Sequence, residues 1–127
     1  MERTARCACG SLSITAIGEP TKVSACHCEA CQRRTGSAFS VAVFYERDKA
    51  MPAGQSHVHS RLGDSGLPVD FHFCPHCGSS VFWYPAFRPR LIGIAIGCFG
   101  SAAPAGPSQS VYEQHRYDWV TIDLAER

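Results

Sequence analysis

Three cysteines lie within six residues of one another: Cys26, Cys28 and Cys31, in the run Cys-His-Cys-Glu-Ala-Cys. This spacing is closer than a disulfide framework needs, whereas three thiolates can converge on one metal ion. A zinc ion with three protein ligands keeps an open fourth position, as in catalytic sites, while a set of four closes a structural site. The run therefore predicts a catalytic zinc centre held by three cysteines.

Four more cysteines could supply a complete structural set, with two lying before the central run and two after it. Cys74 and Cys77 are separated by two residues and followed by Gly78, so both sulfurs can face inward on a tight turn. A redox-active pair of this spacing needs a β-α-β context, and strands are predicted here instead. Cys7 and Cys9 are a weaker signal, because two buried core thiols are the alternative. The leading hypothesis is two zinc ions per chain, one closed and one open.

The predicted chemistry follows from the charge of three thiolates. They donate so much charge that zinc activates bound water poorly, whereas a thiol coordinated to zinc is deprotonated outright and becomes a nucleophile. The open position therefore suits a thiol such as glutathione, whose sulfur would attack an aldehyde carbon, or leave the adduct in reverse. This predicts a carbon–sulfur lyase. Arg33 and Arg34 are candidate binding residues because they could offset a further anionic ligand; solvated surface charges are the alternative.

The histidines near these motifs and the eighth cysteine are not predicted to bind metal. His27 and His76 lie between cysteines, so their side chains are expected to point away from the metal, with His27 beside the site or in solvent. His57 and His59 share one strand face and are expected on the surface. Cys98 has no nearby partner and is expected to be a buried thiol, or otherwise to lie in a substrate pocket near the open zinc.

The bulk composition predicts one soluble globular domain. The chain has 127 residues, 45% of them hydrophobic and 18% charged, with a formal net charge of +1. That balance gives no electrostatic footprint for a nucleic-acid backbone or an anionic membrane. No apolar run has the length of a membrane span, and the N-terminus lacks the apolar core of a signal peptide. We therefore expect a cytoplasmic protein, where clustered cysteines more often bind metal than form disulfides.

The segments that must position these cysteines predict a mainly β fold with little helix. Period-2 alternation and β-branched or aromatic residues predict strands, and a continuous apolar run predicts a strand buried on both faces. The strands are expected at 4–16 (a pair broken at Cys9-Gly10), 37–45, 57–59, 69–73, 80–84 and, buried on both faces, 91–96. Helical turns are expected at 29–34, ended by Gly36 as a C-terminal cap. Residues 46–54 and 100–110 are expected to be loops, and the aromatic-rich segment 111–124 to pack onto the sheet.

Four motifs and the aromatic segment cover nearly the whole chain: Cys7-Ala8-Cys9-Gly10, Cys26-His27-Cys28-Glu29-Ala30-Cys31, Gly36-Ser37-Ala38-Phe39, Phe73-Cys74-Pro75-His76-Cys77-Gly78 and the stretch ending near Trp119. In these motifs, and in the order of its seven cysteines, the chain resembles the glutathione-dependent formaldehyde-activating enzyme family, also called the GFA or CENP-V domain. The resemblance implies a single domain over residues 1–127 with an Mss4-like fold of several coiled antiparallel β-sheets around zinc sites. Gln32 departs from the family pattern, in which a basic residue commonly follows the third cysteine of the central motif.

The resemblance also implies how the seven cysteines are divided, which their spacing alone leaves open. It implies a structural zinc on Cys7, Cys9, Cys74 and Cys77 and a catalytic zinc on Cys26, Cys28 and Cys31. The implied activity is a zinc-dependent carbon–sulfur lyase that acts on a thiol adduct of a small aldehyde, such as S-hydroxymethylglutathione. Its partner would be a small glutathione-like thiol. The alternative is a non-enzymatic, zinc-stabilised protein-binding module.

Overall fold

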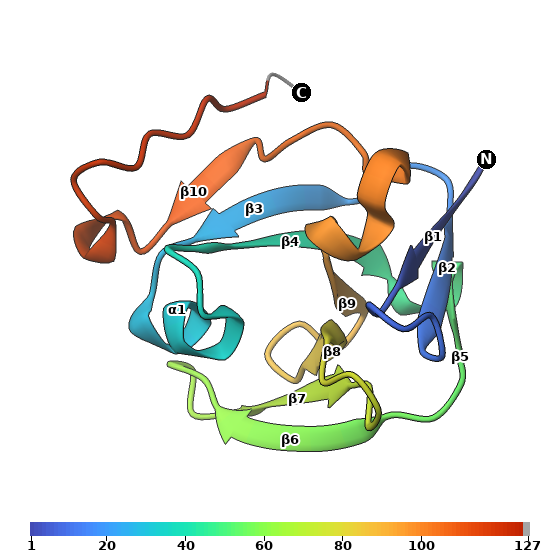
Figure 1. The fold of residues 1–127 in the computed structure, drawn as a ribbon. Helices are drawn as coiled ribbons and strands as arrows, with labels where there is room; N and C mark the ends of the chain where they lie inside the picture. Colours follow the sequence, from blue (N-terminus) through green and yellow to red (C-terminus); the bar gives the residue numbers. More distant parts are fainter. Residues whose placement is uncertain (126–127) are drawn as a thin grey trace.

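Short strands are the main regular elements of the chain, and they make two sheets in the computed structural model of the protein (Figure 1). The structure describes residues 1–125, so the last two residues of the domain predicted over 1–127 lie outside it. The small sheet is ordered β1-β2-β5 and consists of β1 (Glu2–Arg6), β2 (Ser13–Ile17) and β5 (Ala50–Ala53). The large sheet consists of β3 (Lys22–Cys26), β4 (Ser40–Glu46), β6 (His57–Leu62), β7 (Pro68–Phe73), β8 (Ser80–Pro85), β9 (Leu91–Ala95) and β10 (Gln109–Val111). The other elements of the described range are α1 (Glu29–Thr35) and the 3₁₀ segments η1 (Arg47–Lys49), η2 (Ile96–Ala102) and η3 (Glu113–His115).

The large sheet is ordered β10-β3-β4-β9-β8-β7-β6, and it coils so that its two ends come to face each other. In Figure 1, β3 and β4 lie at the top, β6 and β7 at the bottom, and α1 on the side between them. Its pairings are antiparallel except that β10 runs parallel to β3. The predicted mainly β fold, with coiled sheets and little helix, is therefore confirmed, with this one parallel pair added. No helix within residues 1–125 has the length and apolar character needed to cross a bilayer.

Two strands lie where loops were predicted. In the segment 46–54, β5 pairs with β2 and places Pro52 opposite Ile14. The proline is tolerated because β5 is the edge strand of the small sheet, where one side of the backbone needs no partner. At the end of the segment 100–110, β10 pairs with β3. The loop predictions were wrong at these residues because both strands are short and depend on the neighbour that pairs with them.

The main hydrophobic core lies between the two sheets and contains residues from both. Leu12 and Ile14 come from the small-sheet hairpin, and Val43 and Phe82 come from the large sheet. All four side chains are at most 2% exposed. The segment η2 packs against β1 and adds Phe99 to this core. The core therefore holds the two sheets against each other.

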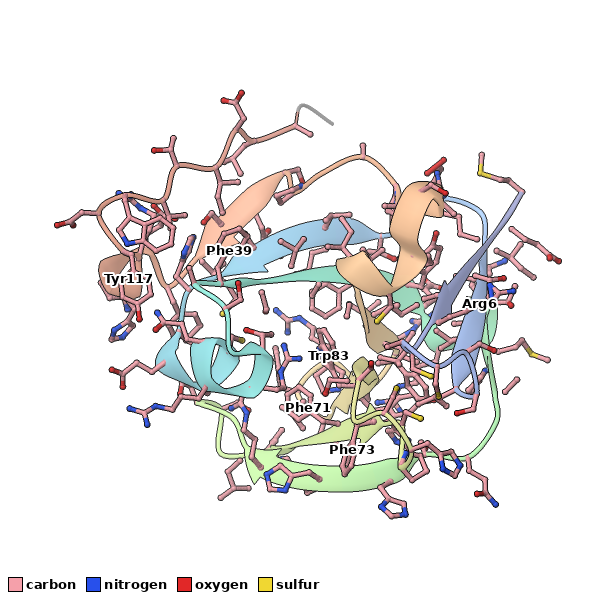
Figure 2. All side chains as sticks on the ribbon, in the orientation of Figure 1. Arg6, Phe39, Phe71, Phe73, Trp83 and Tyr117 are labelled. Carbon is pink, nitrogen blue, oxygen red and sulfur yellow. The ribbon has the colours of Figure 1, made fainter. Side chains whose placement is uncertain are left out.

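A second, smaller apolar cluster lies on the face of the large sheet beside α1, and it consists of Ala42, Val69, Phe71 and Trp83. Phe71 and Trp83 are paired across β7 and β8, with ring centroids 5.6 Å apart. Gly93 lies opposite Trp83, and a Cβ atom there would be only 2.3 Å from Trp83 Nε1. Glycine at this position therefore leaves the space that the indole occupies. Figure 2 shows Phe71 and Trp83 in the interior beside α1.

The aromatic residues of the C-terminal segment do not pack onto the sheet as predicted. Trp119 is 76% exposed and Tyr117 is 46% exposed, while Val120 is the buried residue next to them. Figure 2 shows Tyr117 on the outside of the molecule. Polar contacts hold the segment to the rest of the molecule instead, such as the hydrogen bond of 3.2 Å from Gln32 Nε2 in α1 to the His115 carbonyl. The prediction was wrong because aromatic content alone does not distinguish a buried segment from an exposed one.

Candidate metal centres and the cavity beside one of them

Four of the predicted ligands come together in one group, which consists of Cys7, Cys9, Cys74 and Cys77. Their sulfur atoms all lie within 4.8 Å of one another. The Sγ atom of Cys9 is 3.7 Å from that of Cys7 and 3.7 Å from that of Cys74. Thiolates at about 2.3 Å from a tetrahedral zinc ion would be separated by about 3.8 Å. The donor type and the spacing of this group therefore fit zinc.

The four-cysteine group is built from two turns, each of which ends at a glycine. In the first turn the Gly10 amide donates to the Cys7 carbonyl, and in the second the Gly78 amide donates to the Cys74 carbonyl. Both glycines have φ near +80° (+84° and +80°), in the left-handed region that glycine adopts readily. Backbone amides also donate to the sulfurs. The Leu12 amide nitrogen lies 3.2 Å from Cys7 Sγ, and the Cys77 amide nitrogen lies 3.5 Å from Cys74 Sγ. Such hydrogen bonds stabilise the thiolate form that a metal binds.

This group joins two parts of the fold that are far apart in sequence. The first turn follows β1 in the small sheet, and the second connects β7 to β8 in the large sheet. The Ala8 amide donates to Ser79 Oγ at 3.1 Å, and Ser11 Oγ lies 3.2 Å from Cys74 Sγ. A metal ion here would cross-link the two sheets. Cys98 lies beside this group, half-buried, with its pKa raised by burial and then by the nearby Cys7 and Cys77 thiols.

The other three predicted ligands form a second group at the junction of β3 and α1. Cys26 is the last residue of β3, Cys28 is the N-cap residue of α1, and Cys31 lies in the first turn of that helix. The Sγ atoms of Cys26 and Cys28 are 3.4 Å apart, and the Cys31 amide points at Cys28 Sγ at 3.4 Å. The predicted helix and its cap are confirmed, because α1 ends at Gly36, which has a left-handed conformation. All three sulfurs lie within 4.8 Å of one another, and three thiols are a donor set that fits zinc.

The environment of this group favours a thiolate at neutral pH. A hydrogen bond from Cys26 lowers the pKa of Cys31 to about 5, against the opposing effect of burial. The Ser40 hydroxyl, the Cys28 thiol and the charge of Arg34 lower that pKa further. The same hydrogen bond, together with burial, raises the pKa of Cys26. One proton is thus shared unequally between two of the three thiols, and a dication would replace it.

A cavity of about 380 Å³ opens beside the three-cysteine group, and Cys26, Cys28 and Cys31 all line it. Its lining is mostly apolar and includes the cluster around Phe71 and Trp83. None of the four cysteines of the other group is among its lining residues, and neither is Cys98. The two groups therefore differ in access, because only the three-cysteine group faces this space.

The two arginines predicted to bind substrate lie on different sides of α1. Arg34 lines the cavity, where its guanidinium carbon lies 4.8 Å from the Phe71 ring centroid and 4.6 Å from that of Trp83. Arg33 is exposed and lines a separate surface groove together with Trp119. The structure thus brings Arg34 to the three-cysteine group and places Arg33 away from its cavity.

The cavity also contains a polar pair that no sequence motif indicated. The Tyr112 hydroxyl donates a hydrogen bond to the Asp64 carboxylate, and this bond raises the pKa of Tyr112 to about 12. Tyr112 has φ of +57°, which is uncommon for a residue other than glycine. Tyr112 follows β10 and Asp64 lies between β6 and β7, so the pair links the C-terminal segment to that hairpin beside the cavity.

His27 is buried, which excludes the solvent position considered for it. Its side chain is 0% exposed, and Nε2 lies 2.9 Å from Ser110 Oγ and 3.1 Å from a Glu113 carboxylate oxygen. The Gln32 side chain donates to the His27 carbonyl at 2.8 Å and to the His115 carbonyl at 3.2 Å. These contacts fix the cysteine run to the C-terminal segment, and sequence reasoning missed their partners because they come from a distant segment.

The other three histidines considered at the motifs lie where they were expected. His57 and His59 are exposed on β6, and His76 is exposed between the two cysteines of its turn. None of them belongs to either cysteine group found among residues 1–125. The candidate ligand sets therefore consist of sulfur alone.

The fold and the two cysteine groups define a small β-rich protein with two candidate metal centres, one of which faces a cavity. The chain belongs to the glutathione-dependent formaldehyde-activating enzyme (GFA) family, whose model matches residues 2–115. The family assignment made from the motifs is thereby confirmed.

Comparison with solved structures supports the fold alone. The chain is similar to a crystal structure of a Rhodobacter sphaeroides protein determined as a structural genomics target, with a TM-score of 0.63 and 17% sequence identity. The match covers 85% of this chain and 99% of the other. No curated protein matches the chain significantly.

Proposed function

We propose that the protein is a zinc-dependent carbon–sulfur lyase that acts on the adduct of a small aldehyde and a glutathione-like thiol, such as S-hydroxymethylglutathione. The observation that carries this proposal is that the three-cysteine group lines a cavity of about 380 Å³. A volume of this size is in the range of small-molecule sites. Membership of a glutathione-dependent family supports a thiol as the partner.

The roles of the seven cysteines follow from the difference in access. Cys26, Cys28 and Cys31 would hold a zinc ion that has room for a fourth ligand from the cavity, and the other four cysteines would hold a structural zinc. Zinc bound by three thiolates supplies a position at which a substrate thiol loses its proton at neutral pH.

The chain's own side chains would then orient and stabilise the reactants. Arg34 places a positive charge beside Cys31 and so offsets the negative charge that a substrate thiolate brings. The apolar floor around Phe71 and Trp83 excludes water, which strengthens that electrostatic interaction. In the synthetic direction the thiol sulfur forms the new bond to the aldehyde carbon, and the aldehyde oxygen takes up the proton. In the lyase direction the hydroxyl proton passes to solvent, the carbonyl of the aldehyde forms again, and the sulfur leaves as a thiolate with the electron pair of the broken bond.

Isothermal titration of the zinc-loaded protein with glutathione and with S-methylglutathione tests the proposal. We expect glutathione to bind and S-methylglutathione to bind at least about tenfold more weakly, because the thioether cannot supply a thiolate. Cys28→Ser should lose the preference, and exchange between S-hydroxymethylglutathione and free glutathione, measured by NMR, should be faster with the wild type. If both compounds bind alike, or neither binds at millimolar concentration, the lyase proposal fails.

The alternative is a non-enzymatic, zinc-stabilised binding module, and one surface feature favours it. Tyr117 and Trp119 stack with ring centroids 5.7 Å apart, and both are exposed. Exposed aromatic pairs of this kind are common in protein interfaces. A protein that fails the thiol test while Trp119→Ala abolishes binding to a partner would support this function. Either activity fits a reducing compartment such as the cytoplasm, because all eight cysteines are unpaired.

A further inference from the structure

Two arginines converge on one aromatic ring in the cavity, and neither forms an ion pair with a carboxylate among residues 1–125. The guanidinium carbon of Arg34 lies 4.8 Å from the Phe71 ring centroid, and that of Arg61 lies 5.3 Å from it. The Nε atoms of both side chains are buried without a hydrogen-bond partner. Two positive charges therefore meet at Phe71 without a paired carboxylate from the described part of the chain.

The register of the sheet places both guanidinium groups on the cavity side. Arg61 in β6 pairs with Val69 in β7, and Phe71 in β7 pairs with Trp83 in β8. Residues directly opposite in an antiparallel pair share a face, and so do residues two apart in one strand. Arg61 therefore projects from the same face as Phe71 and Trp83, and Arg34 reaches that face from α1. Both arginines line the cavity beside the three-cysteine group.

Each guanidinium needs a partner for its charge and for its buried Nε–H group. The faces of Phe71 and Trp83 partly satisfy the charge of Arg34 through cation–π contacts, but they accept none of the in-plane N–H bonds. Asp64 also lines the cavity, but its carboxylate accepts the hydrogen bond of Tyr112. The unused donors have the fork geometry that matches a carboxylate in two parallel bonds.

The apolar floor defines the rest of the ligand. The lining of the cavity as a whole is mostly apolar, with polar residues such as Ser24, Ser40 and His115 among it, and its floor is the cluster Ala42, Val69, Phe71 and Trp83. Such a surface gains free energy by burying an apolar body and gives no hydrogen bonds to the peptide groups of a tripeptide. Glutathione carries two carboxylates and an ammonium group on such a backbone, so we expect it to bind here, but more weakly than a thiol with an apolar body and one carboxylate.

We propose that Arg34 and Arg61 form a carboxylate subsite, and that the substrate of the three-cysteine centre is a thiol–aldehyde adduct with an aromatic or similarly apolar body and a single carboxylate. This inference rests on the proposed function for the chemistry of the site and names its substrate class. The body lies on Phe71 and Trp83, the carboxylate bridges the two guanidinium groups, and the reacting sulfur points toward the three cysteines.

The probe that tests the subsite is 3-phenylpropionate, with 3-phenylpropan-1-ol as its uncharged counterpart. Trp83 and Trp119 are the two tryptophans of the chain, so Trp119→Phe leaves Trp83, in the cavity floor, as the sole tryptophan, which can be excited selectively over the tyrosines. We expect the acid to change Trp83 emission at millimolar concentration or below, and the alcohol to bind at least about tenfold more weakly. Isothermal titration with the zinc-loaded protein gives the same comparison without the fluorophore.

Variants assign the effect to the two arginines. Arg34→Gln and Arg61→Gln are each expected to weaken binding of the acid about tenfold or more while leaving binding of the alcohol unchanged. Arg34→Lys keeps the charge without the fork and should give a smaller loss. Arg33→Gln is the matched control, since Arg33 is the exposed neighbour on α1, and it should bind like the wild type. Zinc content and circular dichroism confirm that each variant is folded.

The outcomes separate this inference from the proposed function. If the acid and the alcohol bind alike, if neither binds, or if Arg33→Gln weakens binding as much as Arg34→Gln, the carboxylate subsite is wrong. Glutathione-dependent exchange observed in the same protein would not rescue the subsite. It would leave only the lyase proposal intact. If the acid binds through both arginines while no thiol binds in preference to its thioether, the subsite stands and the lyase proposal fails.

Discussion

The two cysteine groups offer the same ligand atoms in opposite structural settings. The four-cysteine group joins a turn after β1 to a turn between β7 and β8, so its ligands come from both sheets. The three-cysteine group lies within one short run at the junction of β3 and α1. The first group has its sulfurs facing one another between two turns, and the second faces a cavity.

From this difference we expect the sequence separation of the ligands to decide what a bound metal ion would do for the fold. A metal that joins distant turns restricts the chain as a cross-link would, and its binding free energy becomes folding free energy. The local group is held independently of metal by the pairing of β3 with β4 and by the Gln32 side chain, which donates to the His27 carbonyl. A metal ion bound there would therefore be free to serve a reaction without carrying the stability of the domain.

The largest expected effect comes from removing one ligand of each group. Wild-type protein purified without chelator is expected to contain two zinc ions. Cys74→Ser should be insoluble or molten, because a structural zinc contributes on the order of 10–16 kcal/mol, against a domain stability of about 5–15 kcal/mol. Cys31→Ser should remain folded and lose one zinc ion. Circular dichroism and elemental analysis measure both effects.

The matched control for these substitutions is Cys98→Ser, which alters a half-buried thiol that belongs to neither group. It should keep both zinc ions and the wild-type spectrum. Equal loss of structure in Cys74→Ser and Cys31→Ser would break the comparison, because both metals would then be structural. A single zinc ion in folded, fully reduced wild-type protein would also contradict it.

A smaller loss of stability is expected from a substitution that alters only the cavity floor. A methyl group at Gly93 would lie 2.3 Å from Trp83 Nε1, so Gly93→Ala must displace the indole from the cavity floor. Overpacking of this kind typically costs about 1–3 kcal/mol. We expect a lower midpoint of urea unfolding and weaker binding of cavity ligands, with both zinc ions retained.

Gly97→Ala is the control for this substitution, because a Cβ atom there meets no atom within 4 Å. It should leave both the unfolding midpoint and ligand binding close to those of the wild type. If Gly93→Ala loses zinc, the cavity floor and the three-cysteine group are coupled more tightly than their separate contacts indicate.

The sequence predicted what depends on local pattern. Strands with one buried face were found through their alternation, and the ligand sets through their spacing, because both signals lie within a few residues. The choice between Arg33 and Arg34 could not be made, since consecutive residues point about 100° apart around a helix and the buried face is set by the sheet. Asp64, Tyr112 and Arg61 gave no signal, because three separate segments bring them to the cavity.

The smallest expected effect concerns the hydrogen bond between Tyr112 and Asp64, which exists only on the cavity side of the comparison. Because this bond raises the pKa of Tyr112 from its ordinary value near 10 to about 12, its stabilising effect should be complete below about pH 10 and lost as pH rises toward 12. Ultraviolet titration should show one tyrosine ionising near pH 12, and Tyr112→Phe should remove that step. Asp64→Asn keeps an acceptor without the charge, so it should return the step toward pH 10 while zinc content and the unfolding midpoint at neutral pH change little. A step that persists near pH 12 in Tyr112→Phe would assign it to another tyrosine, such as Tyr84, whose pKa burial also raises, and would remove the evidence for this link beside the cavity.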